Sequence, residues 1–161
     1  MTNSELFYKK FIQTPLQNID DHFYVDGWVK VHLDELKRNS KPHHVIAKDR
    51  PKFPVVASHG LEDIFTKWSL ANFTTQRTVV VSGAIDVKDK ATIDSRLQSL
   101  YRTCIKAILT SILASPDFVK DVPKFALNNA KFSIPDDELM YAMFELNITI
   151  TTQENINTWL D

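Results

Sequence analysis

The side chains that could bind a metal ion are five histidines, of which His43 and His44 are adjacent and His22, His32 and His59 are scattered. Adjacent side chains in a loop point apart, and neither an HExxH nor a CxxC pattern occurs. The glycines are isolated, which excludes a glycine-rich phosphate cradle of either common spacing. We therefore expect polar histidines in loops, no metal site and no cofactor.

Two groups could act as nucleophiles in covalent catalysis, the thiol of Cys104 and the hydroxyl in the sequence Ser58-His59-Gly60. Cys104 lies on the apolar stripe of a predicted helix, where a thiol behaves as a small hydrophobic side chain. Ser58 follows a predicted strand, but the flanking glycine pattern of a nucleophile elbow is absent. Both groups are better explained by structure than by catalysis.

A run of carboxylates, Asp136-Asp137-Glu138, resembles a general acid/base cluster or a magnesium site. Acidic residues immediately after a proline, here Pro135, more often cap or polarise a turn. We therefore expect no catalytic residue and a protein that is not an enzyme.

The strongest local concentration of charge lies in segment 37–52, which contains two prolines and no strong periodicity and is therefore a connection. A solvated connection is the favoured interpretation, because no aromatic residues are interleaved that could stack on single-stranded nucleic acid. A partner surface or DNA phosphates could nevertheless meet its basic residues, which are Lys37, Arg38, Lys41, Lys48, Arg50 and Lys52.

Length and composition bound the class of protein. With 161 residues, 43% of them hydrophobic and 24% charged, the chain has the balance of one globular domain. The formal net charge of −1 gives no overall attraction to nucleic acid or to an anionic membrane. No apolar run approaches the roughly 18 residues of a membrane span, and the single cysteine fits a reducing cytoplasm. We expect no membrane partner.

The clearest element that could position these side chains is a long amphipathic helix at about 91–114. Apolar residues recur there at spacings of three and four. Asp89 or Thr92 can cap its start. The preceding strand, 79–87, alternates in polarity and is predicted to be half-buried, with Gly83 as a bulge or a point of close contact. Residues 67–77 suit a pairing strand or the outer part of a long hairpin.

The strongest strand pattern covers 139–152 and would span about 46 Å, well beyond the usual strand length. A strand this long is expected to reach past its local core. Its even-numbered residues form one apolar face. Three residues make its second face unusually apolar, and they are Leu139, Tyr141 and Met143.

The remaining patterns complete one α+β domain over 1–161. Residues 52–58 predict a strand in which Pro54 marks an edge or a start, and two short strands with an Asn-Asn turn are predicted between residues 116 and 135. The N-terminal 40 residues look mainly helical, with a break near Thr14 because Thr14-Pro15-Leu16-Gln17 matches a capping box. A helical part with the basic loop at 1–50 thus precedes an antiparallel sheet of long strands and the long amphipathic helix at 51–152.

This order of elements resembles the tail terminator, or tail completion, proteins of bacteriophages with long flexible tails. The parts most similar to that family are the strand followed by "SHGLEDI" and the strand that passes directly into "ATIDSRLQSLYRTCIKAIL". The resemblance covers about residues 50–152 and rests on apolar patterns of moderate specificity.

The resemblance implies a homohexameric ring on the last ring of the tail tube, in the neck region of a virion that is assembled in the host cytoplasm. Its partners would be the tail tube protein and head completion or connector proteins, with the genome DNA passing through without sequence-specific binding. On this hypothesis Leu139, Tyr141 and Met143 are expected to be buried under a helix or at a subunit interface. The alternatives are a head completion or other neck protein, and a small metal-dependent nucleic-acid-processing enzyme.

Overall fold

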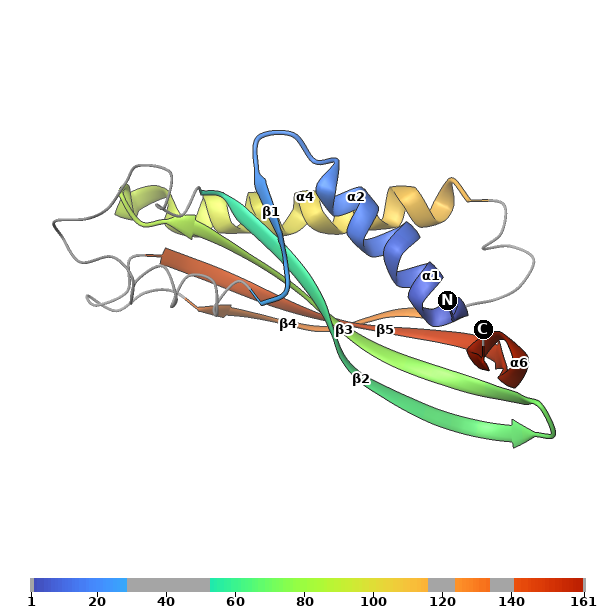
Figure 1. Cartoon of the computed structure of the whole chain (residues 1–161). Helices are drawn as coiled ribbons and strands as arrows, with labels where there is room; N and C mark the ends of the chain where they lie inside the picture. The colour runs from blue at the N-terminus through green and yellow to red at the C-terminus, as the bar shows by residue number, and fades with distance from the viewer. Residues whose placement is uncertain (1, 29–52, 116–123, 134–140, 161) are drawn as a thin grey trace, which may run out of the picture.

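The computed structural model describes residues 2–28, 53–115, 124–133 and 141–160, and within them the chain forms one five-stranded sheet with helices on one face (Figure 1). The strand order is β1-β2-β3-β5-β4, with β1 and β2 parallel and the other neighbouring pairs antiparallel. The predicted α+β class is confirmed. The elements are α1 (Asn3–Tyr8), a π-helical segment (Lys9–Gln13), α2 (Thr14–Gln17), β1 (Phe23–Asp26), β2 (Val55–Ser69), β3 (Asn72–Asp86), a 3-10 turn (Lys90–Thr92), α4 (Ile93–Leu113), β4 (Lys124–Ser133), β5 (Tyr141–Asn155) and α6 (Ile156–Leu160).

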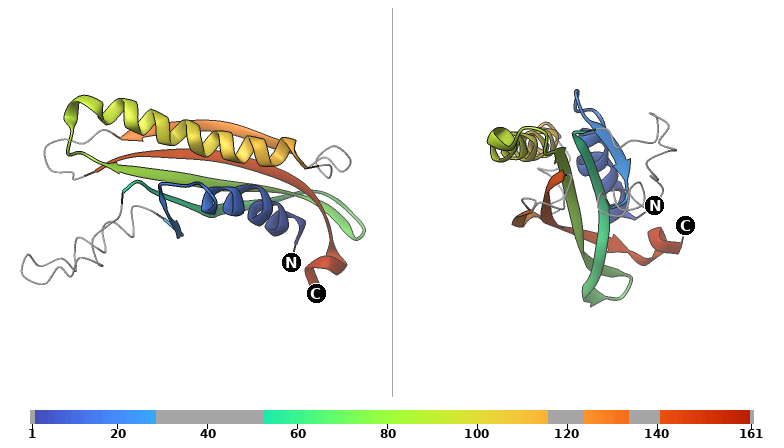
Figure 2. Two further views of the ribbon diagram at one scale, coloured as in Figure 1. Left: turned by 90° about the horizontal axis from the view of Figure 1, so that it is seen from above. Right: turned by 90° about the vertical axis from the view of Figure 1, so that its left-hand side faces the viewer.

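Helix α4 lies along the sheet and confirms the helix predicted at about 91–114 (Figure 2). The Asp89 carboxylate accepts a hydrogen bond from Ala91 N at 3.2 Å, whereas the Thr92 side chain makes no capping bond. Asp89 is therefore the cap. The buried side chains of α4 belong to the predicted apolar stripe, and they are Ile93, Leu97, Leu100, Cys104, Ile108 and Ile112.

The N-terminal helix continues from α1 through the π-helical segment into α2, so the predicted break near Thr14 is wrong. Pro15 has no N–H to donate, and the Thr14 N–H donates to the Lys9 carbonyl five residues back. A π turn of this kind keeps the helix continuous before the proline. The capping box lies at the start of α1, where Thr2 Oγ1 accepts from Glu5 N at 3.1 Å and the Glu5 carboxylate accepts from Thr2 N at 2.8 Å.

Strands β2 and β3 form a hairpin of two 15-residue strands, which confirms the predicted pairing. Strand β2 starts directly after Pro54, so the proline marks the start of the strand. Both faces of β3 are buried from residue 79 to 85, so the prediction of a half-buried strand is wrong. One face packs against the helices, and the other contributes Ala84 to a second apolar cluster on the far side of the sheet.

Gly83 is a point of close contact between the layers. A Cβ atom at this position would lie 2.5 Å from Phe144 Cε1 on β5 and 3.1 Å from Leu100 Cδ2 on α4. The pairing of β3 with both neighbouring strands is continuous through Gly83. Of the two predicted roles, the structure therefore supports close contact and excludes a bulge.

Strand β5 confirms the long strand predicted near the C-terminus and extends it to Asn155. Strand β4, by contrast, runs through the asparagine pair as one strand with a register shift between Leu127 and Asn129, so the predicted turn is wrong. Asn128 Nδ2 donates to Thr149 Oγ1 at 2.6 Å, and Asn147 Nδ2 donates to Asn129 Oδ1 at 3.0 Å. These bonds to β5 keep both asparagines within the strand.

Strand β1 is an element that the sequence patterns do not predict. Its four residues pair in parallel with residues 55–58 of β2. The helix before it ends at Gln17, so the expectation of a mainly helical start holds for residues 3–17 and fails at β1, and residues 29–40 lie outside the described parts of the chain. The chain turns between them at Asp21, which has a positive φ of 63°, and His22 Nε2 is 2.6 Å from the Leu16 carbonyl oxygen.

The buried carboxylate of Glu154 joins the end of β5 to the start of α1. Its side chain is 2% exposed and accepts hydrogen bonds from Asn3 N at 3.0 Å, Ser4 N at 2.7 Å and Thr152 Oγ1 at 2.8 Å. The N–H groups at a helix start have no partner within the helix and attract negative charge. Glu154 therefore fixes the N-terminal helix to the sheet.

Replacement of Glu154 by glutamine is expected to lower the free energy of unfolding by about 2 kcal/mol, because a neutral amide accepts fewer and weaker hydrogen bonds than a carboxylate. Denaturant titration measures this change. The matched control is Glu62→Gln at an exposed position of β2, with an expected change of less than about 0.5 kcal/mol. Equal losses in the two variants would contradict this role of Glu154.

Candidate interaction surface

The end of the β2–β3 hairpin that carries the turn projects past the end of α4 (Figures 1 and 2). Trp68 is 61% exposed there, and Leu70 in the turn is fully exposed. Large exposed apolar patches on soluble proteins usually mark interaction sites. We call the exposed apolar side chains of residues 61–70 and of α6 the hairpin surface, and they are Leu61, Ile64, Phe65, Trp68, Leu70, Ile156, Trp159 and Leu160.

An aromatic cluster supports the hairpin surface from the side of the sheet that carries the helices. The rings of Trp68 and Phe73 are stacked with centroids 4.4 Å apart, and Phe65 and Trp159 approach Phe73 at 5.8 and 5.5 Å. Trp159 belongs to α6, so the C-terminal helix closes over the hairpin. These contacts hold large apolar side chains in fixed positions, which lowers the entropy lost on binding.

An ion pair stiffens the hairpin where it leaves the core. Arg77 Nε and Nη2 donate to the two carboxylate oxygens of Asp63, each at 2.8 Å. This bidentate hydrogen bonding raises the pKa of the Arg77 guanidinium. The two residues are cross-strand partners in β2 and β3, so the pair fixes the register of the projecting part.

The sheet face opposite the helices is polar and uncharged over residues 74–78 of β3 and 147–153 of β5, beyond the second apolar cluster. Residues that alternate with the core positions point to this face. Thr, Asn and Gln side chains dominate it, and they are Gln76, Thr78, Asn147, Thr149, Thr151 and Gln153. Such a face offers hydrogen-bonding groups without attracting phosphates.

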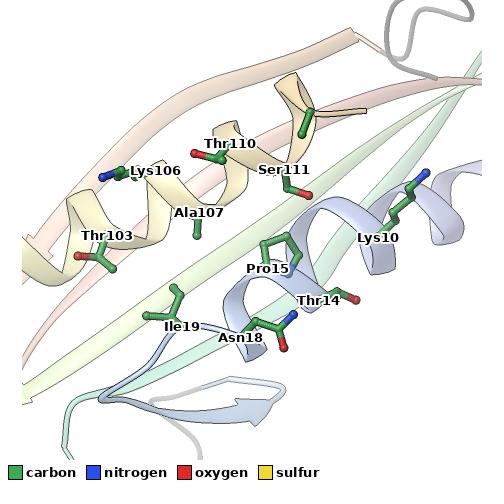
Figure 3. A pocket seen from close by; sticks show the side chains of 11 residues that line it. Lys10, Thr14, Pro15, Asn18, Ile19, Thr103, Lys106, Ala107, Thr110 and Ser111 are labelled. Carbon is green, nitrogen blue, oxygen red and sulfur yellow. The ribbon is translucent and has the colours of Figure 1, made fainter. Parts of the chain in front are cut away.

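A groove of about 470 Å³ lies between the N-terminal helix and α4 (Figure 3). Small side chains such as Ala107 and Ser111 line it from α4, and Pro15 and Ile19 face them from the other side. No carboxylate, histidine or cysteine is among its lining residues in the part of the chain that the structure describes. The groove therefore offers a packing surface, with the amino groups of Lys10 and Lys106 as its ionisable groups.

The sequence Ser58-His59-Gly60 lies within β2, so the expectation that it follows a strand is wrong. The buried Ser58 hydroxyl lies 2.9 Å from the Tyr8 hydroxyl and 2.8 Å from that of Tyr24, and burial raises the pKa of both tyrosines. His59, expected in a loop, lies in β2 with its ring 5.2 Å from the Trp28 ring and tilted to it by 44°, and burial lowers the pKa of His59. Within the described residues no hydrogen bond joins Ser58 to His59, so the two do not form a nucleophile and its base.

Cys104 is fully buried, and burial raises the pKa of its thiol to about 12. The unfolded chain ionises this thiol from about pH 9, whereas the folded chain keeps it neutral, so Cys104 makes stability fall as pH rises between these values. We expect native protein at pH 8 to resist a thiol-labelling reagent and denatured protein to react at one thiol per chain. Rapid stoichiometric labelling of the native chain would contradict the core position.

The predicted interface residues Tyr141 and Met143 are each 6% exposed and belong to the second apolar cluster, with Val55, Ala57 and Ala84. Their burial thus arises within the chain, and a contact with another subunit stays a prediction. Other predicted residues lie outside the described parts of the chain, and they are Leu139, the carboxylates at 136–138, the histidines at 32, 43 and 44, and the basic residues Lys37, Arg38, Lys41, Lys48, Arg50 and Lys52.

The sequence matches no known protein-family model, and no curated protein is significantly similar to it. None of the described helices combines the length and apolar character that crossing a bilayer requires. Among the described residues, no three His, Cys, Asp or Glu side chains gather as ligands for a metal ion. The hairpin surface is thus the strongest candidate site. The sequence patterns did not predict it as an exposed patch, although "FTKWSL" contains Phe65, Trp68 and Leu70.

Proposed function

We propose that this chain is a bacteriophage virion protein that caps the tail tube as a ring, ends tail growth and presents the tail-side surface for head joining. The observation that carries the proposal is the β2–β3 hairpin, which extends the sheet past α4 and exposes Trp68 and Leu70. Such a surface is normally covered by another protein. A contact between unlike surfaces of identical chains closes into a ring when its rotation permits.

The neutral sheet face supports a ring through which DNA passes. Phosphates bind to proteins mainly through lysine and arginine, because these side chains displace counterions. Threonine and asparagine predominate on β5 at this face, for example Asn147, Thr149 and Thr151. A bore lined by them would let the genome move without holding it. The partners in this proposal are the tail tube protein on one side and head completion or connector proteins on the other.

Gold-labelled antibody against the chain tests the proposal in virions of the virus that encodes it. We expect label at the junction of head and tail, and in broken particles we expect it on the isolated tails. Label on isolated heads would instead assign the chain to the alternative, a head completion protein. Label along the whole tail, or none on the particle, would contradict the proposed function.

A further inference from the structure

Within the described residues, each outer edge of the sheet lacks a neighbouring strand over a similar length. Strand β1 covers β2 only at 55–58, so no described strand lies beside residues 60–69, and the ten-residue β4 is the outermost strand on the other side. Natural sheets usually protect such edges with charges, prolines or covering loops. Here the two edges carry exposed apolar side chains, which are Leu61, Ile64, Phe65 and Trp68 on β2, and Leu127 and Phe132 on β4.

The two edges run in opposite directions. The pairs β2–β3, β3–β5 and β5–β4 are all antiparallel, so β2 and β4 point opposite ways. A second copy placed beside the first, with its helices on the same side, therefore brings its β4 antiparallel to β2. Antiparallel strands form the slightly more stable ladder and leave no unpaired edge between the copies.

The side-chain alternation then limits the register between the two edges. Asp63 and Phe65 point to the helix side of β2, because their partners Arg77 and Thr75 do. On β4, the helix side carries Ala130, which packs against the main core. Registers that keep these sides together differ by steps of two residues.

Strand β2 has a register shift between Gly60 and Glu62, and β4 has one between Leu127 and Asn129. Between these shifts, the register that sets Asp63 opposite Ala130 keeps the sides together and places Glu62 opposite Lys131. Both side chains are exposed, and within the described residues neither has an ion-pair partner. A shift of two residues would instead set Glu62 against Ser133 or Asn129. We infer that residues 60–69 of β2 pair with β4 of a second copy, with Glu62 opposite Lys131.

The stagger of this register fits a closed ring. Lys131 is opposite Glu145 on β5, and Glu62 is opposite Thr78, which is opposite Thr149 on β5. Each copy therefore shifts the register by four residues over four strands, or one residue per strand. An eight-stranded barrel with a shear of eight has the same ratio, and its strands tilt by about 36°. Repeated contacts would place the helices outside and the neutral polar face inside.

Two charge reversals test the pairing of β2 with β4. The inference rests on the proposed function, because only the proposed ring requires these pairings to close on themselves. Glu62→Lys and Lys131→Glu each set like charges opposite one another and should raise the dissociation constant between copies about tenfold. In a mixture of the two variants, alternating copies restore opposite charges at every contact, so sedimentation should show recovered assembly. Lys106→Glu, on the exposed side of α4, is the control and should assemble normally. Equal weakening in all three variants, or no recovery on mixing, would overturn the inference.

A cysteine pair tests the register directly. The variant Ile64→Cys with Asn129→Cys places two thiols on the same face of the paired strands, and a short bifunctional thiol reagent should join it into a ladder of covalent oligomers. In the control, Ile64→Cys with Ala130→Cys, the second thiol lies on the other face and no ladder should form. A chain that stays monomeric at every concentration would overturn this inference. The two sheet edges would then be expected to pair with a strand of another protein. Gold label at the neck would then still support the proposed function.

Discussion

Replacement of Gly83 by valine is expected to lower the free energy of unfolding by about 3 kcal/mol and the melting temperature by about 10 °C. The first added carbon would lie 2.5 and 2.8 Å from two atoms of the Phe144 ring and 3.1 Å from Leu100 Cδ2. Phe144 is completely buried, so its ring has no free volume to move into. Thermal and denaturant unfolding of the purified variant measure the loss.

Gly60→Val is the matched control for this prediction. Gly60 also lies on the hairpin, but a Cβ atom there would meet no atom within 4 Å. Its expected change is within about 0.5 kcal/mol. The double variant Gly83→Ala with Phe144→Leu tests the cause. Its loss of stability should be smaller than the sum of the losses in the two single variants, because leucine leaves room for the added methyl group. Full additivity would show that the close contact is not the cause.

Replacement of Trp68 by lysine is expected to abolish function while the chain stays folded. The side chain is 61% exposed, so its loss changes folding little, but a buried tryptophan at an interface commonly contributes at least about 2 kcal/mol to binding. That loss weakens each contact in the proposed ring about 30-fold. The measurement is the yield of infectious particles when the variant is supplied to a virus that lacks the gene.

Leu113→Lys is the control for the hairpin surface. Leu113 is 82% exposed at the end of α4, away from the hairpin, so it removes a similar apolar surface elsewhere. This variant should support a normal yield, and both variants should keep their melting temperatures within a few degrees of the unaltered chain. A normal yield with Trp68→Lys would remove the hairpin surface from the account.

The long elements could be predicted from sequence because their patterns repeat many times. Helix α4 buries six of its predicted apolar positions, such as Leu97 and Ile108, and leaves Tyr101 and Ile105 half-buried, while β5 alternates in burial from Phe144 onward. A periodic signal of this kind is summed over many turns or residue pairs. A short element contains too few residues for its periodic signal to stand out. Strand β1 has only four residues and forms because β2 offers it a partner, which no local pattern reveals.

The errors have physical causes in packing and local hydrogen bonds. Alternation in β3 predicts one polar face, but Ala84 on that face belongs to the second apolar cluster, and Val80 and Ser82 are also buried there. The proline at position 15 indicates a new helix, yet a π turn before it keeps the chain helical. Asn128 and Asn129 favour a turn in isolation, and cross-strand bonds to β5 hold them in a strand instead. In each case tertiary contacts override a local preference.

The candidate site was less accessible to sequence reasoning than the fold. The apolar residues Tyr141 and Met143 were predicted to be buried, and they are, but within the chain. The aromatic residues of the hairpin resemble those of any strand, and only the projection of the hairpin past α4 shows that they are exposed. The side chains at the end of the hairpin are exposed because α4 stops before it. Sequence patterns predict the helix and the strands but do not predict how far one extends past the other in space.

Electron microscopy of particles made when this gene carries a nonsense mutation tests the central claim most directly. The proposed role requires that tail growth stops and that heads join only after this chain binds the tube. We therefore expect overlong tails, or complete tails separated from full heads. Virions of normal shape in normal numbers would contradict the account.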